Sequence, residues 1–366
     1  MLILAIETSC DETSCAVVQD GRLVRSNVVA SQIDLHAPYG GVVPEIASRR
    51  HVEIITLVAR QALDVAGARI QDLDAIAATR GPGLAGALLV GFSFGRGLAQ
   101  ARGLPFIPVN HLEGHLHSVW LTRDEPMPPE PKLPLMALIV SGGHTELVLM
   151  NAHGDYIRVG RTLDDAAGEA FDKVARLLGL GYPGGPAIQA AAAAASSPVT
   201  LPRAWLRGTH DFSFSGLKTA TLHVVARTAR GEAADVRGAG PPSADLSREL
   251  TGTEVANIAA GFQESVVDVL VVKTMRAAEQ YGARSIAVVG GVAANRLLRE
   301  RMEGACALPL YISPPEFSTD NAAMIAAAAY FARAVQPDCD IKPNLPLAAS
   351  RLVRAGRRTP NQDASS

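Results

Sequence analysis

The feature that most narrows the possible folds is a strand, polar turn, strand unit that occurs twice. Apolar runs at 2–6 and 14–18 flank a polar segment, and apolar runs at 136–140 and 146–150 flank a turn of small residues. Short apolar runs bounded by turn residues are typical of buried strands. The recurrence predicts a duplicated domain with a cleft between the copies, although two unrelated β-hairpins would produce the same pattern.

Strands and helices alternate along the rest of the chain, which predicts an α/β protein. An amphipathic stretch at 45–65 and a glycine-rich stretch at 84–101 are expected to be helices. Five prolines in residues 124–134 break regular structure and mark a linker. The linker divides the chain into lobe one, residues 1–123, and lobe two, residues 135–318.

The C-terminal part is expected to return to the first lobe. A helix at about 319–335 is predicted to pack on lobe one, and the arginine-containing tail at 345–366 is predicted to be flexible. The C-terminal helix would therefore belong to lobe one in space although it follows lobe two in sequence.

Composition limits where the protein works and what it binds. The 366-residue chain is 48% hydrophobic and carries a formal charge of −2, so it has no overall basic field for a nucleic acid. The four cysteines form no CxxC pair, which favours buried thiols in a reducing compartment over disulfides. The apolar start is too short for a signal peptide, and no stretch approaches the roughly 18 apolar residues of a membrane span. We therefore expect a cytoplasmic protein without a membrane segment.

Three histidines lie close together in NHLEGHLHS at 110–118. Because a helix turns about 100° per residue, His111 and His115 would lie about 40° apart on one face, whereas His117 would project away. Two imidazoles leave a divalent cation short of ligands, and Asp320 is the best third candidate. Structural roles remain open for both features, since histidines occur on ordinary helix faces and Asp320 stands where an N-cap would.

Glycine-rich turns occur four times, and such turns let backbone N–H groups approach phosphate oxygens. The turn at Gly290-Gly291 is the most informative, because it joins an apolar strand at 285–289 to a helix. It is neither a GxGxxG nor a Walker loop. The pattern indicates a nucleotide pocket of another kind.

Three acidic residues are candidates for chemistry. Asp11 and Glu12 stand in the first polar turn, where a carboxylate can hold a cation, accept a proton or cap the turn. Asp172 is expected on a helix, where it is either functional or half of a surface ion pair. Spacing alone does not choose between these roles.

Ten motifs follow one another along the chain: IETSCDET at the start, GGVVPEIASRRHVE at 40–53, TRGPGL at 79–84, NHLEGHLHS at 110–118, SGGHTEL at 141–147, DDAAGEAFDK at 164–173, YPGGP at 182–186, FSFSGLKT at 212–219, GGVAAN at 290–295 and FSTDNAAM at 317–324. Together they resemble the TsaD family, also called Gcp or YgjD, from residue 3 to about residue 335. Ten motifs in register make this a specific resemblance.

The resemblance implies a two-lobed fold of the actin, sugar kinase and Hsp70 type (ASKHA) with a nucleotide in the interlobe cleft. It implies transfer of threonylcarbamoyl from threonylcarbamoyl-AMP to N6 of the adenosine 3′ of the anticodon, in tRNAs that read codons beginning with A. It further implies three partners: a paralogous TsaB-like subunit, a small TsaE-like ATPase and a separate enzyme that makes the adenylate.

The resemblance also implies roles for particular residues. His111, His115 and Asp320 would bind one divalent metal per subunit, with Fe(II) as the expected ion and Zn(II) as the alternative. The nucleotide-bearing substrate would be bound by residues from four segments, namely Ile139, Val140, Ser141, Gly142, Gly143, Asp172, Gly185 and Asn295. Gln189 departs from the family pattern, in which many relatives carry an acid. For the catalytic step, we expect Asp11 or Glu12 to accept the amine proton.

Three other functions fit parts of the sequence. A zinc metalloprotease is suggested by the clustered histidines, but a zincin carries HExxH, whereas Glu113 stands two residues after His111, about 200° round the helix. A non-catalytic nucleotide-binding scaffold would use the glycine turns but would not need the metal. A sugar or acyl kinase would need a transferable γ-phosphate. Removing the metal with a chelator distinguishes the metal-dependent enzyme from a scaffold. Labelled ATP tests for a kinase.

Overall fold

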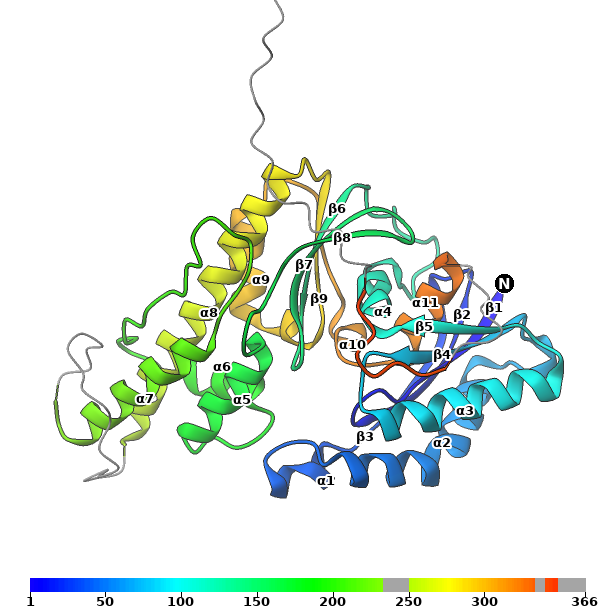
Figure 1. Ribbon diagram of the computed structural model, residues 1–366, viewed down its shortest axis with the longest axis horizontal. Helices are drawn as coiled ribbons and strands as arrows, with labels where there is room; N and C mark the ends of the chain where they lie inside the picture. The colour runs from blue at the N-terminus through cyan, green and yellow to red at the C-terminus, as the bar shows by residue number, and fades with distance from the viewer. Residues whose placement is uncertain (233–249, 333–339, 348–366) are drawn as a thin grey trace, which may run out of the picture.

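The first lobe is built on a five-stranded mixed sheet (Figure 1). The computed structural model describes residues 1–232, 250–332 and 340–347. The sheet order is β3-β2-β1-β4-β5, and β1 pairs antiparallel with β2 and parallel with β4. The strands are β1 (Leu2–Glu7), β2 (Glu12–Gln19), β3 (Leu23–Ser31), β4 (Ala75–Gly81) and β5 (Phe106–Asn110).

The second lobe repeats this topology. Its order, β8-β7-β6-β9-β10, places an antiparallel β6–β7 pair beside a parallel β6–β9 pair, as in the first sheet. The strands are β6 (Leu135–Val140), β7 (Thr145–Ala152), β8 (Asp155–Arg161), β9 (Ser285–Val289) and β10 (Leu310–Ile312). The predicted two-lobed, duplicated α/β fold is therefore confirmed. The short strand β10 and the edge strand β8 were not expected from the sequence.

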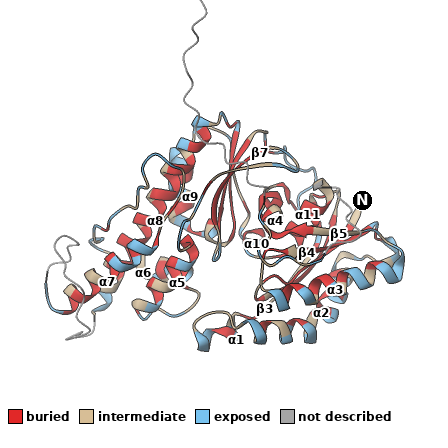
Figure 2. Cartoon of the chain, in the orientation of Figure 1, coloured by how far each residue is buried: buried red, intermediate tan, exposed pale blue. Residues whose placement is uncertain are grey.

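Helices cover both faces of the first sheet. One face packs against α2 (Pro44–Ala66) and α3 (Ala85–Arg102), and the other against α11 (Ala322–Ala332). Alternation along β1 explains this arrangement, because Leu4 and Ile6 join the α2 side while Ile3 and Ala5 join the α11 side. Figure 2 shows the corresponding buried stripes on α2 and α3. The smaller elements of this lobe are α1 (Ile33–His36), η1 (Ala37–Tyr39), η2 (Ile70–Asp72), α4 (His111–His117) and η3 (Ser118–Trp120).

The second lobe is built around one long helix, α8 (Gly252–Gln280). Among the described residues it is the one helix long and apolar enough to cross a membrane, contrary to the expectation that no such stretch exists. In its most apolar window 72% of the residues are buried inside the lobe, as in a core helix. The other helices are α5 (Ala167–Leu177), α6 (Gly184–Ala192), α7 (Ser215–Ala229), η4 (Gly291–Ala294), α9 (Arg296–Ala305) and α10 (Pro315–Ser318).

Two described segments have no regular structure: one joins the lobes and the other follows the last helix. Residues 124–134, all of them described, contain no helix or strand and lead from the first sheet into β6. Residues 340–347 lie against lobe one, where the Lys342 N–H donates to the Arg80 carbonyl at 2.7 Å. Residues 345–347 were expected to begin a flexible tail but are held here, since the Pro346 carbonyl accepts a hydrogen bond from Asn110 Nδ2 at 3.0 Å. The remainder of that tail, 348–366, lies outside the described residues.

Candidate functional site

Helix α4 carries the histidine pair and lies between the two lobes. Leu112 and Leu116 belong to a buried cluster with side chains of β6, β7 and β9. On another side, a Cβ added to Gly114 would lie 2.8 Å from the Ile325 side chain of α11. The helix start is capped by Asn110, whose Oδ1 accepts the Leu112 N–H at 2.9 Å. Packing and capping together hold α4 in a defined position.

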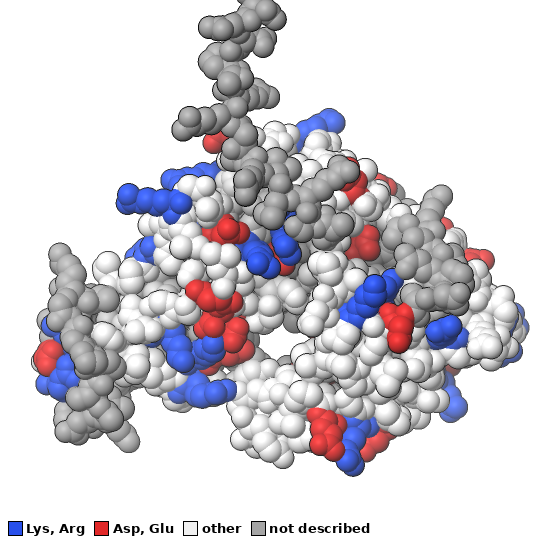
Figure 3. Space-filling view, in the orientation of Figure 1, with Lys and Arg blue, Asp and Glu red and all other residues white. Residues whose placement is uncertain are grey.

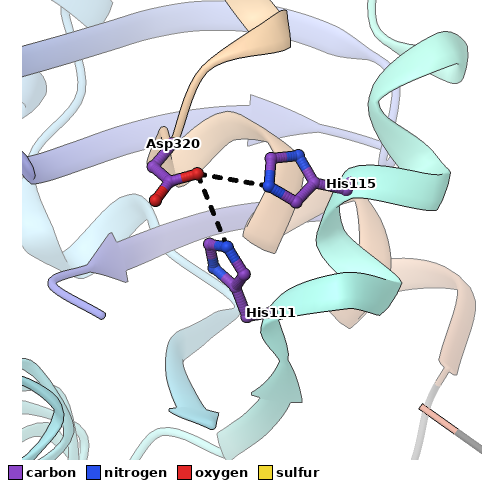
Figure 4. Close-up of side chains that lie close together, drawn as sticks. All are labelled: His111, His115 and Asp320. Carbon is purple, nitrogen blue, oxygen red and sulfur yellow. Dashed lines mark ion pairs between the residues drawn. The ribbon is translucent and has the colours of Figure 1, made fainter. Parts of the chain in front are cut away.

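The two imidazoles converge on Asp320 (Figure 4). The Nε2 atoms of His111 and His115 lie 3.5 and 3.2 Å from Asp320 Oδ1, and one ligand atom from each residue lies within 4.8 Å of the others. Ligands of a tetrahedral ion with bonds of about 2.0–2.1 Å are separated by about 3.3 Å, which is similar. The other ring nitrogen of His115, Nδ1, is buried without a hydrogen-bond partner among the described residues. Geometry and donor type fit a divalent metal ion, so this cluster can bind one.

Asp320 is not the N-cap that its position suggested. The neighbouring Asn321 occupies that place, because its Oδ1 accepts the Met324 N–H at 3.1 Å. Its Nδ2 donates to the carbonyls of Phe317 and Thr319. The Asp320 carboxylate is therefore available to the histidines.

Glu7 is a site residue that the sequence reasoning missed. It is fully buried at the end of β1, and its Oε2 accepts hydrogen bonds from His111 Nδ1 at 3.0 Å and from Thr79 Oγ1 at 2.6 Å. Its other oxygen accepts the Ser9 N–H at 2.5 Å. A carboxylate on Nδ1 fixes the tautomer that presents Nε2 to a metal. The available signal was a charged residue directly after an apolar strand.

The buried charges of this cluster stabilise one another. Burial alone would raise the pKa of Glu7 and of Asp320, but His111 outweighs it and holds both pKa values below their usual range. Burial would lower the pKa of His111, but Asp320 and Glu7 raise that pKa well above its ordinary value. The pKa of His115 is lowered, chiefly by burial. Because a metal ligates neutral imidazole, metal and proton compete for His111.

Glu7→Gln is expected to weaken metal binding by about 10- to 100-fold, since the amide cannot orient His111 as a carboxylate does. Competition with a chromophoric chelator measures this affinity. Thr79→Val removes only one bond to Glu7 and should cause a smaller loss. Native affinity in the Glu7→Gln protein would show that Glu7 does not orient the ligand.

In lobe two, the turn after β6 and the helices α5 and α6 form one continuous surface. The Gly168 N–H donates to the Ser141 carbonyl at 3.2 Å, and a Cβ on Gly168 would lie 2.6 Å from that oxygen. The Gly184 N–H donates to Asp172 Oδ1 at 2.7 Å. Three predicted substrate-binding glycines would meet no described atom within 4 Å if they carried a Cβ, namely Gly142, Gly143 and Gly185. These glycines are open to a ligand, and Figure 3 shows a hollow between the lobes.

Other predicted substrate residues have internal partners. Ile139 and Val140 are fully buried at the end of β6, which is paired with β7 and β9, so their side chains are not exposed to a ligand. Asn295 caps α9 by accepting the Leu298 N–H at 3.0 Å, while its Nδ2 donates to Gln263 at 2.8 Å. Asn295 therefore shapes this part of the site through the start of α9.

The turn before α9 is tightly held. Gly290 has φ +95°, and a Cβ there would lie 2.5 Å from the Val140 carbonyl oxygen. Gln189 Oε1 accepts the Arg296 N–H at 2.7 Å, which ties α6 to the first residue of α9. The amide thus has a defined structural role at the position where many relatives were expected to carry an acid.

Charged groups of lobe one shift the pKa values of two residues of lobe two. Burial, followed by the charges of His111 and His115, lowers the pKa of His144 in the turn after β6 to about 4. Burial, followed by the charge of Asp11, raises the pKa of Tyr182 at the start of α6. Burial, then Asp11, also raises the pKa of Glu12 well above its ordinary value. Charges of the metal cluster and of the acidic turn thus act on His144 and Tyr182, which are near the open glycines in sequence.

Two residues of α4 point away from the metal cluster, as the helical spacing predicts. The Glu113 carboxylate accepts a hydrogen bond from the Tyr156 hydroxyl of β8 at 2.6 Å. His117 Nε2 is bonded to His153 Nδ1 at 3.0 Å, and its ring stacks on Phe331 with centroids 5.2 Å apart. The glutamate that makes the motif look proteolytic is thus engaged with β8.

The duplicated α/β fold is that of the actin, sugar kinase and Hsp70 class, and a His, His, Asp cluster that can bind a metal ion lies at α4, between the lobes. The solved structure of HypF from T. kodakarensis has the same fold, with a TM-score of 0.57 and 14% identity over 90% of this chain and 47% of that chain. The profile of the TsaD family, tRNA N6-adenosine threonylcarbamoyltransferase, matches residues 23–327.

Curated relatives carry the same description. One from Thermomicrobium roseum is 56% identical over 97% of this chain and 100% of its own length. Another from Dehalococcoides mccartyi is 49% identical over 90% of this chain and 93% of its own length. The chain therefore belongs to the tRNA N6-adenosine threonylcarbamoyltransferase family, a family of transferases, as the ten motifs predicted.

Proposed function

We propose that this chain transfers the threonylcarbamoyl group of threonylcarbamoyl-AMP to N6 of the adenosine 3′ of the anticodon, in tRNAs that read codons beginning with A. The products are N6-threonylcarbamoyladenosine and AMP. The observation that carries the proposal is the His111, His115 and Asp320 cluster, which can bind a metal ion, on a helix packed against β6, the strand that leads into the open turn at Gly142 and Gly143. We place the enzyme in the cytoplasm, where a tRNA substrate is found.

Transfer of the threonylcarbamoyl group requires alignment of the reactants and stabilisation of developing charge. Threonylcarbamoyl-AMP is a mixed anhydride, so N6 attacks an activated carbonyl carbon, the N–C bond forms, and the C–O bond to phosphate breaks. AMP leaves with that electron pair, and the amine loses a proton. No enzyme nucleophile is required. The chain can contribute orientation, preorganised N–H donors and a proton acceptor.

Residues of both lobes supply these contributions. Backbone N–H groups of Ser141 to Gly143 would hold the phosphate, and the surface at Gly185 would receive the adenosine. The ion on the metal cluster, Fe(II) in our proposal and Zn(II) as the alternative, would act as a Lewis acid toward carbonyl or phosphate oxygens. We assign proton acceptance to Asp11 or Glu12, neighbouring carboxylates of the acidic turn.

A reconstituted assay tests the metal and the donor together. With purified threonylcarbamoyl-AMP and tRNA, chelation is expected to abolish modification, and added Fe(II) or Zn(II) to restore it. Modification that persists after complete metal removal would contradict the metal role. The same assay tests the proposed partners, because a TsaB-like subunit and a TsaE-like ATPase should increase turnover.

Asp11→Asn and Glu12→Gln test the acidic turn. If one of these carboxylates accepts the amine proton, its amide variant should slow single-turnover transfer by about 10²- to 10⁴-fold without loss of metal. Rapid quench with labelled threonylcarbamoyl-AMP measures the step. Native rates in both variants would remove Asp11 and Glu12 from the mechanism.

A further inference from the structure

His51 of α2 bridges the two ends of the acidic turn. Its ring is fully buried, with Nε2 3.0 Å from the Cys10 carbonyl oxygen and Nδ1 2.7 Å from Thr13 Oγ1. A carbonyl only accepts hydrogen bonds, so Nε2 carries the proton and Nδ1 accepts from the Thr13 hydroxyl. One imidazole therefore holds the residue before Asp11 and the residue after Glu12.

Gln32 joins the same network from the segment between β3 and α1. Its backbone N–H donates to the Asp11 carbonyl at 3.0 Å, and its Nε2 lies 3.3 Å from His51 Nδ1. Both the glutamine and the histidine are buried. Burial also lowers the pKa of His51, which agrees with a neutral ring that accepts at Nδ1. The turn is thus held at three places, Cys10, Asp11 and Thr13.

We propose that His51 is a positioning residue for threonylcarbamoyl transfer: in its neutral Nε2–H form it holds the backbone of the acidic turn so that Asp11 and Glu12 face the substrate across the cleft. This inference rests on the proposed role of those carboxylates. A displacement of about 1 Å at a reacting group can slow a reaction about 100-fold, so loss of this support has a measurable effect.

The test compares His51→Leu, which removes both hydrogen bonds, with His51→Gln, whose side-chain amide retains an N–H near the Nε2 position. We expect the leucine variant to lower the single-turnover rate about 100-fold with unchanged metal affinity and unchanged KM for tRNA. The glutamine variant should recover most of that rate. A purely structural role would change stability without this recovery.

Two further variants keep the test decisive if His51→Leu does not fold. Thr13→Val removes only the hydrogen-bond partner of His51 Nδ1 and should lower the single-turnover rate about tenfold. In a double variant with His51→Gln, the two effects on the rate should be non-additive. His36→Leu is the matched control, because His36 is also buried in lobe one but bonds the Val43 N–H at 3.3 Å. It should retain the native rate.

The outcomes separate the inference from the proposed function. If Asp11→Asn slows transfer while His51→Gln, His51→Leu and Thr13→Val all react at the native rate, the positioning role is wrong and the acidic turn stands. Equal losses in the leucine and glutamine variants would also overturn the inference, since no hydrogen bond would then be restored. If neither Asp11→Asn nor Glu12→Gln affects transfer, the role of the acidic turn fails first.

Discussion

Asp320→Ala is expected to abolish metal binding and to slow threonylcarbamoyl transfer about a thousandfold. Its Oδ1 lies within 3.5 Å of both histidine Nε2 atoms, and its loss leaves two neutral ligands. A Lewis-acid contribution of about 4 kcal/mol corresponds to a factor of about 10³ in rate. Elemental analysis of the purified protein and single-turnover kinetics measure the two effects.

Two neighbouring variants are the controls for Asp320→Ala. Asn321→Ala removes the N-cap of α11 and should lower the free energy of unfolding by about 1 kcal/mol while the protein keeps its metal. Glu113→Gln changes a carboxylate of α4 that faces Tyr156, so both metal content and transfer rate should remain native. Stoichiometric metal in Asp320→Ala would refute the ligand assignment. Loss of transfer in Glu113→Gln would indicate that the Glu113 carboxylate acts as a base.

Gly290→Ala is expected to lower the free energy of unfolding by about 3 kcal/mol. A side chain at φ +95° is strained, and its Cβ would lie 2.5 Å from the Val140 carbonyl oxygen of β6. With ψ at 167°, this backbone conformation costs a non-glycine residue about 1–3 kcal/mol, and overpacking costs about 1–3 kcal/mol, which together give this magnitude. Urea unfolding measures the change.

The adjacent Gly291→Ala is the matched control for this prediction. Its added Cβ would lie 3.9 Å from the nearest described atom, a Thr319 methyl group, and its φ is outside the left-handed region. The expected change in unfolding free energy is within about 0.5 kcal/mol. If the two variants were equally stable, the close contact between Gly290 and β6 would not be the reason that glycine is required there.

The central strands could be predicted because their side chains are buried on both faces and form continuous apolar runs, as in β1 and β6. The edge strand β8 was missed because its residues are mostly half-buried or exposed and include charged side chains. Strand β10 has three residues, too few for a period to emerge. Helix α6 was missed because its alanine- and glycine-rich sequence shows no clear apolar stripe.

The candidate site was predictable to different degrees. The histidine pair is a local property, because residues four apart on a helix share a face wherever the helix packs. Asp320 carried an N-cap signal that belongs to Asn321, and one residue of offset decides which side chain is free. Glu7 gave no periodic signal, and its role depends on contacts with His111 and Thr79, far away in the chain.

By itself, the sequence determined the duplicated α/β architecture, the histidine face of α4 and, through ten motifs, the family. Only the tertiary structure decided that Glu7 meets His111 and which residues hold the acidic turn. Periodicity and capping depend on residues within a few positions of one another, so the sequence expresses them directly. The meeting of Asp320 with α4, of Glu7 with His111 and of His51 with Cys10 depends on how α2 and α11 pack on the first sheet and how α4 packs on strands of the second. That packing is settled by burial of apolar surface.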